Sequence, residues 1–113
     1  MEKSHYDYRP SDWEVITSIG TKSLIVRFEI HEVEEGGFDC LEVTYNFKGD
    51  LSEDDYGKIV SAIIRGVYSE DDVEAILNNY LSDPEGHSEE FETLQLWRNE
   101  AKSTARQIIE SVN

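Results

Sequence analysis

Clustered carboxylates are the side chains of this 113-residue sequence that most readily suggest chemistry. The tetrapeptide Ser52-Glu53-Asp54-Asp55 recurs as Ser69-Glu70-Asp71-Asp72, and Ser88-Glu89-Glu90 has a similar order. Carboxylates can bind Ca²⁺, but a calcium loop spreads its ligands over about twelve residues around a central glycine, and these segments do not. A serine followed by acids in the next three positions is instead typical of a helix N-terminus. We therefore expect three helix starts here, with no metal site and no cofactor.

Glu29 and His31 form the second candidate for chemistry. They stand two residues apart in an alternating segment, so a regular strand would place both on one face. Together with a carboxylate from another strand they would make a small metal-assisted or acid–base enzyme, which we keep as an alternative. The ordinary interpretation is a solvated outer face of a sheet.

The remaining nucleophiles and ligands form no recognisable catalytic pattern. The three histidines are far apart in the sequence, so no zinc spacing is present. The single cysteine, Cys40, lies between Asp39 and Glu42, and nearby acids disfavour its thiolate. Glycine-rich phosphate loops and a nucleophile elbow are absent from the sequence. We therefore expect a protein that is not an enzyme.

The charge balance narrows the choice of partners. The chain has 25 acidic and 10 basic residues, a formal net charge of −15. Such a charge repels phosphate backbones and anionic membranes, so direct nucleic-acid or membrane binding is not expected, whereas basic partners are attracted. No Lys or Arg occurs between Gly66 and Trp97. The predicted partner-binding residues are the acids of this span, mainly Glu70, Asp71, Asp72, Glu74, Glu89 and Glu90.

These observations favour a non-catalytic protein-binding module, an adaptor or inhibitor that engages a basic partner surface. A second alternative is a nucleic-acid mimic that inhibits a nucleic-acid-binding protein. Apolar runs never approach the length of about 18 residues that a membrane helix needs, and the N-terminus has no apolar leader. With a single cysteine, these features lead us to expect a cytoplasmic protein.

The elements that must position these residues follow from the hydrophobic period. Apolar residues alternate with polar ones over residues 13–19, 24–31 and 41–47, and Gly36-Gly37 favours a hairpin turn between the last two segments. After Lys48 the apolar spacing changes to three and four, which predicts helices over 56–67, 73–81 and 91–112.

Strands followed by helices predict an α+β fold in the order βββααα, a three-stranded antiparallel meander with three helices packed on one face. We expect residues 1–113 to form a single domain, with residues 1–10 as a loosely held N-terminal arm. Uncovered strand edges could pair with those of another copy, so a homo-oligomer is a further alternative.

Overall fold

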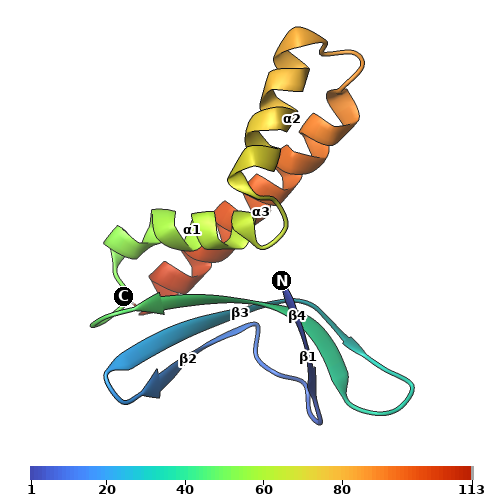
Figure 1. The fold of residues 1–113 in the computed structure, drawn as a ribbon. Coiled ribbons are helices and arrows are strands. Elements are labelled where there is room, and N and C mark those ends of the chain that lie inside the picture. The colour runs from blue at the N-terminus through green and yellow to red at the C-terminus, as the bar shows by residue number, and fades with distance from the viewer. Residues whose placement is uncertain (113) are drawn as a thin grey trace. The chain divides into compact units, whose positions relative to one another are not determined.

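A computed structural model describes residues 1–112 of the chain. Within this range the fold is α+β, an antiparallel sheet of four strands followed by three helices (Figure 1). The strands are β1 (Glu2–Tyr6), β2 (Trp13–Ser18), β3 (Thr21–Glu32) and β4 (Phe38–Phe47). A 3-10 turn, Glu53–Asp55, precedes helices α1 (Tyr56–Arg65), α2 (Glu70–Ser82) and α3 (Ser88–Val112). The chain divides into two compact units, the sheet unit Met1–Leu51 and the helical unit that begins at Ser52.

The predicted hairpin is confirmed as β3 and β4, which pair in antiparallel register with Val26 opposite Val43. Gly36 and Gly37 in its turn have φ angles of 99° and 81°, a region that favours glycine. Gly37 is also needed for space, since a Cβ atom there would lie 2.5 Å from the carbonyl oxygen of Tyr6.

The predicted number of strands is wrong, because the sheet has four strands rather than three. The additional strand, β1, lies within the segment that was expected to be a loose arm, and it pairs with β4 from Glu2↔Glu42 to Tyr6↔Phe38. Its side chains lack an apolar period, so backbone pairing, and not the hydrophobic pattern, defines this strand.

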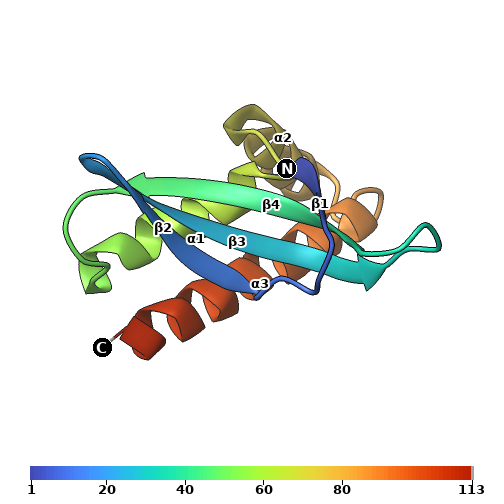
Figure 2. The ribbon, with the colours of Figure 1, turned by 90° about the horizontal axis from the view of Figure 1, so that it is seen from below.

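The strand order β1-β4-β3-β2 puts β1 and β2 at opposite edges (Figure 2). The connection between them, residues 7–12, must therefore cross one face of the sheet. Pro10 in this connection is buried.

The two faces of the sheet differ in chemistry. Leu24, Val26 and Val43 are buried on one face, here called the apolar face. Arg27 and Glu42 face each other across β3 and β4 on the opposite side, here called the Arg27 face. The Arg27 guanidinium donates a hydrogen bond to the backbone carbonyl of Ser11, which belongs to the connection 7–12. This connection therefore covers the Arg27 face.

A β-bulge in β3 changes the expected positions of Glu29 and His31. The register shifts between Phe28 and His31, and Glu29 has a φ of 54°. Arg27 pairs with Glu42, whereas His31 pairs with Asp39. Asp39 and Glu42 are three residues apart on β4 and therefore lie on opposite faces, so His31 lies on the opposite face from Arg27. The expectation of one regular outer face through this segment is therefore wrong.

The helical unit confirms the predicted helices and their starts. The Ser69 hydroxyl accepts a hydrogen bond from the Asp72 amide at 3.1 Å, and the Ser69 amide donates to Asp72 Oδ2 at 3.3 Å. The Ser52 amide donates to Asp55 Oδ2 at 2.9 Å. The second copy therefore caps α2 as the sequence predicts, whereas the first copy caps the 3-10 turn that precedes α1, through the Asp55 carboxylate.

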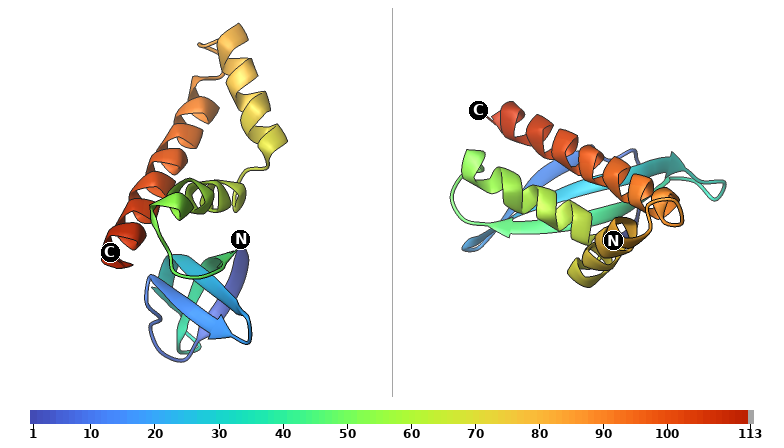
Figure 3. Two further views of the ribbon diagram at one scale, coloured as in Figure 1. Left: turned by 90° about the vertical axis from the view of Figure 1, so that its left-hand side faces the viewer. Right: turned by 90° about the horizontal axis from the view of Figure 1, so that it is seen from above.

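Helix α3 packs mainly against α1 and less extensively against α2. Ile59 and Ile63 of α1 are fully buried, as are Leu94 and Ile108 of α3. Helices α2 and α3 run in opposite directions from their shared loop (Figure 3). None of the described helices combines the length and apolar character needed to cross a bilayer. The single domain and the packing of helices on the sheet remain predictions from the sequence.

Candidate functional site

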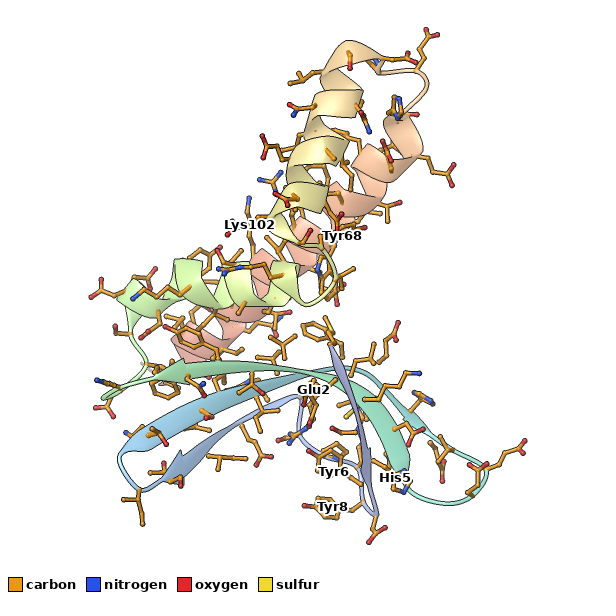
Figure 4. The ribbon with its side chains drawn as sticks, in the orientation of Figure 1. Glu2, His5, Tyr6, Tyr8, Tyr68 and Lys102 are labelled. Carbon is orange, nitrogen blue, oxygen red and sulfur yellow. The ribbon has the colours of Figure 1, made fainter. Side chains whose placement is uncertain are left out.

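The helical unit contains a cavity of about 550 Å³ that is lined by residues of α2, of the first turns of α3, of the loop between these helices and by Tyr68. Its lining residues are Tyr68, Ile76, Gly86, His87, Glu89, Glu90 and Thr93. Tyr68 stands just before α2 (Figure 4). The lining thus combines an aromatic ring and an aliphatic side chain with two carboxylates, a composition that suits recognition of an apolar group beside a cation.

Incomplete burial of α2 leaves this region of the helical unit open. None of the thirteen residues of α2 is fully buried, and Leu81 at its end is 79% exposed. The rings of Tyr80 and Phe91 stack with centroids 3.8 Å apart and hold the two helices together near their loop. The apolar stripe that the sequence predicts for α2 is therefore only partly satisfied within the described chain.

The electrostatics of the cavity are strongly one-sided. Glu89 and Glu90 occupy the first turn of α3, where the helix dipole favours negative charge. Nδ1 of His87 lies 2.8 Å from Oε1 of Glu90. The span from Gly66 to Trp97 carries nine carboxylates and no Lys or Arg, so His87 is the only basic side chain that this span places beside the two glutamates.

The predicted partner-binding acids separate into two groups. Glu89 and Glu90 line the cavity. Glu70, Asp71 and Asp72 form the first turn of α2, where Asp72 is engaged in the helix cap, and these acids, like Glu74, are outside the cavity lining. The sequence did not reveal that Tyr68, Ile76 and Thr93 would join the two glutamates, because that juxtaposition requires the antiparallel packing of α2 on α3.

Glu29 and His31 do not form a ligand pair. Nδ1 of His31 lies 2.7 Å from the backbone carbonyl oxygen of Glu29. The register places Asp39 between His31 and His5, and Nδ1 of His5 lies 2.7 Å from Oδ1 of Asp39. Among residues 1–112, no group of three or more His, Cys, Asp or Glu side chains is arranged to hold a metal ion.

The sequence interpretation missed a buried ionic network on the Arg27 face. The Arg27 side chain is 1% exposed. Its Nε donates to Glu42 Oε2 at 2.7 Å, and its Nη2 donates to Glu14 and, at 3.1 Å, to the Tyr6 hydroxyl. Its Nη1 donates to the Ser11 carbonyl at 3.0 Å. Arg27 therefore ties β2, β4, β1 and the crossing connection to β3.

The Glu42 carboxylate is the central acceptor of this network. Besides Arg27, it accepts a hydrogen bond from the Ser4 hydroxyl at 2.6 Å and one from the Tyr6 hydroxyl at 2.5 Å. The Arg27 guanidinium also lies over the Tyr6 ring, 4.9 Å from its centroid. Figure 4 shows Tyr6 on β1, beside Tyr8. No buried side-chain nitrogen or oxygen in the described chain lacks a hydrogen-bond partner.

The pKa values of the network reflect these contacts. Burial by itself lowers the pKa of Arg27, but hydrogen bonds to Glu14, Glu42 and Tyr6 outweigh it and raise the pKa overall. Burial alone would raise the pKa of Glu42, but hydrogen bonds from Ser4, Tyr6 and Arg27 lower it below its ordinary value. The charges of Arg27 and Glu42 are thus present at neutral pH, and the geometry gives this pair a structural role.

Cys40 is buried in β4, in agreement with the sequence-based expectation of a small strand residue. Burial raises the pKa of its thiol, and the nearby Glu42 carboxylate raises it further. A thiol with a raised pKa is a poor nucleophile at neutral pH.

Comparison with known proteins adds no family to this geometry: no protein-family model, no curated protein and no solved structure matches the chain.

Proposed function

We propose that the chain is a non-catalytic protein-binding module whose α2–α3 cavity binds a basic, partly apolar segment of a partner protein. One observation carries this proposal: Tyr68, Ile76 and two carboxylates line one cavity, in a span that has no Lys or Arg. An adaptor or an inhibitor would use such a surface in the same way.

The chemistry of the cavity defines the partner segment. An apolar side chain of the partner would enter beside Ile76 and Tyr68, and burial of that side chain would supply most of the affinity. A Lys or Arg of the partner would pair with Glu89 or Glu90. Since these pairs are exposed, they contribute mainly to the association rate and to the choice of partner.

A set of synthetic peptides tests the proposal. The first has Leu at helical spacing with Lys elsewhere, the second has Ser in place of Leu, and the third has Glu in place of Lys. Fluorescence anisotropy is measured at about 0.01 M and about 0.15 M salt, between which the Debye length falls from about 30 Å to about 8 Å. We expect the first peptide to bind most tightly and to weaken at the higher salt concentration.

Matched variants locate the binding site. Glu89→Gln combined with Glu90→Gln is expected to weaken binding of the Leu/Lys peptide about tenfold at low salt. The control, Glu29→Gln with Glu32→Gln, removes the same charge from exposed positions of the sheet unit and should have little effect. Ile76→Ser should weaken the Leu/Lys peptide more than the Ser/Lys peptide.

Equal losses of peptide affinity in the Glu89/Glu90 and the Glu29/Glu32 double variants would mean that only the overall charge attracts the peptide. This result would refute the cavity as the binding site. Equal affinity for the Leu/Lys and Ser/Lys peptides would show that the cavity takes no apolar side chain.

A further inference from the structure

Strand β2 is an open edge of the sheet. It pairs with β3 on one side, and the strand order leaves its other side without a neighbour. Of its side chains, Val15 is 39% and Ile16 is 46% exposed. The strand contains no Lys, no Pro and no register shift within its pairing to β3, which are the features that usually protect an edge from association.

The opposite edge, β1, is protected by charge. It carries Glu2 and Lys3 within five residues, and Asp7 follows directly. The single charged residue of β2 is Glu14, whose carboxylate accepts a hydrogen bond from the buried Arg27. The two edges therefore differ in their capacity to accept another strand.

The hydrogen bonds of the sheet identify the backbone groups that point away from it. The Arg27 amide donates to the Asp12 carbonyl at 2.8 Å, and bonded pairs alternate along an antiparallel ladder. Residues at even positions of β2 therefore bond to β3, whereas Trp13, Val15 and Thr17 direct their amides and carbonyls outward. The Trp13 carbonyl accepts from the Ser11 hydroxyl at 3.0 Å, which fits this outward orientation.

We propose that β2 pairs with β2 of a second copy of the chain, in antiparallel register about Val15, to form a continuous eight-stranded sheet. In this register Val15 faces Val15 of the second copy and Trp13 faces Thr17 of the second copy. The pairs at residues 13, 15 and 17 each exchange two hydrogen bonds. A slip by two residues in either direction leaves only two such pairs within the strand.

The sequence of β2 is complementary to itself in this register, which supports a second copy of the chain as the partner of the β2 edge. In the register about Val15, Glu14 faces Ile16 of the second copy, so no like charges are opposed across the strands. The slip that pairs residues 13 and 15 would instead place Glu14 opposite Glu14. The exposed Ile16 and Val15 both gain a partner in the proposed register.

The net charge of −15 on each copy opposes the contact at long range. Salt screens this repulsion, so we expect the dimer to strengthen with added salt. Binding of a basic peptide to the α2–α3 cavity responds in the opposite direction. This inference concerns the sheet unit alone and does not depend on the proposed function.

Sedimentation velocity tests the proposal at protein concentrations up to about 1 mM, because so small a contact belongs to the weak end of protein interfaces. We expect the average mass to rise toward that of a dimer. Val15→Lys should raise the dissociation constant about tenfold, since two lysines then face each other. Leu96→Lys, an equivalent change at a 71% exposed position of α3, is the control and should leave the dimer intact.

A mixing experiment tests the register. Val15→Lys and Val15→Glu should each be weaker dimers alone, and an equimolar mixture should form a heterodimer, detected by native mass spectrometry. Far-UV circular dichroism confirms that each variant is folded.

A chain that stays monomeric at every concentration and salt level overturns the proposal, as does a dimer that Val15→Lys leaves unchanged. A dimer that both variants weaken, without recovery in the mixture, excludes the register about Val15.

Discussion

Replacing Glu42 with Gln tests whether the Arg27 network holds the sheet unit together. The Glu42 side chain is 12% exposed and accepts three hydrogen bonds through its two oxygens. A glutamine of the same shape keeps one acceptor oxygen and loses the negative charge, so at least one buried donor among Ser4, Tyr6 and Arg27 loses its acceptor. Hydrogen bonds to charged groups contribute about 1.5–3 kcal/mol each. We expect the free energy of unfolding to fall by about 2–3 kcal/mol.

Glu14→Gln is the matched control. Glu14 also accepts from Arg27, but its side chain is 45% exposed, so water screens the pair. We expect a loss below about 1 kcal/mol. The contrast compares a buried acceptor of three hydrogen bonds with a half-exposed glutamate that contacts the same arginine.

Urea unfolding at neutral pH measures both losses. Trp13 lies in β2 and Trp97 in α3, so a Trp97→Phe background makes the fluorescence report on the sheet unit alone. Equal losses for the two variants, or a loss below about 0.5 kcal/mol for Glu42→Gln, would refute the reasoning, because a buried charged acceptor cannot then be the main support.

The pH dependence gives an independent check. The pKa of Glu42 in the folded state is lowered from an ordinary value of 4.5, so its charge stabilises the fold above that value. This contribution is lost as the pH falls through the lowered pKa. The difference in unfolding free energy between the wild type and Glu42→Gln should therefore shrink in acid, and a difference that stays constant down to the acid transition would contradict the assignment.

Three further predictions concern the sheet unit. Gly37→Ala should destabilise the sheet unit by about 2 kcal/mol or more, because Gly37 combines a φ of 81° with a Cβ position 2.5 Å from the Tyr6 carbonyl oxygen. Gly36→Ala is the control and should cost about 1 kcal/mol, since Gly36 has a φ of 99° but open space around it. Equal losses of the two variants in urea unfolding would contradict the close approach at Gly37. Cys40 should react with a thiol reagent much more slowly in the folded chain than in urea, and fast labelling of the folded chain would contradict its burial. Since burial raises the pKa of its thiol from 9.0, the Cys40 contribution to stability should be complete below pH 9.0 and lost as the pH rises through the raised value, an alkaline loss that Cys40→Ser should reduce.

Local patterns were sufficient to predict most of the elements. The change of apolar spacing near Lys48 separates strands from helices, and the repeated Ser-Glu-Asp-Asp sequence marks two helix starts. Each of these signals lies within a few residues of the structure that it specifies, so the sequence alone carries it. Strand β1 has no such signal, because an edge strand can form through backbone pairing without an apolar period.

The candidate site was predictable only in part. The sequence indicates that the span from Gly66 to Trp97 is acidic, and it includes Glu89 and Glu90 among the partner-binding residues. It does not indicate that these two lie with Tyr68 and Ile76 around one cavity. Charge is a property of each residue, whereas a cavity is a property of how two helices pack.

Composition and hydrophobic period by themselves determined the α+β class, the helix caps and the strong negative charge of this protein. Tertiary structure alone decided which residues meet. The bulge at Glu29 moved His31 to the other face of the sheet, and the crossing of residues 7–12 enclosed Arg27 with Glu42. The reason is that periodicity acts within a segment, whereas register and burial depend on contacts between segments far apart in the chain.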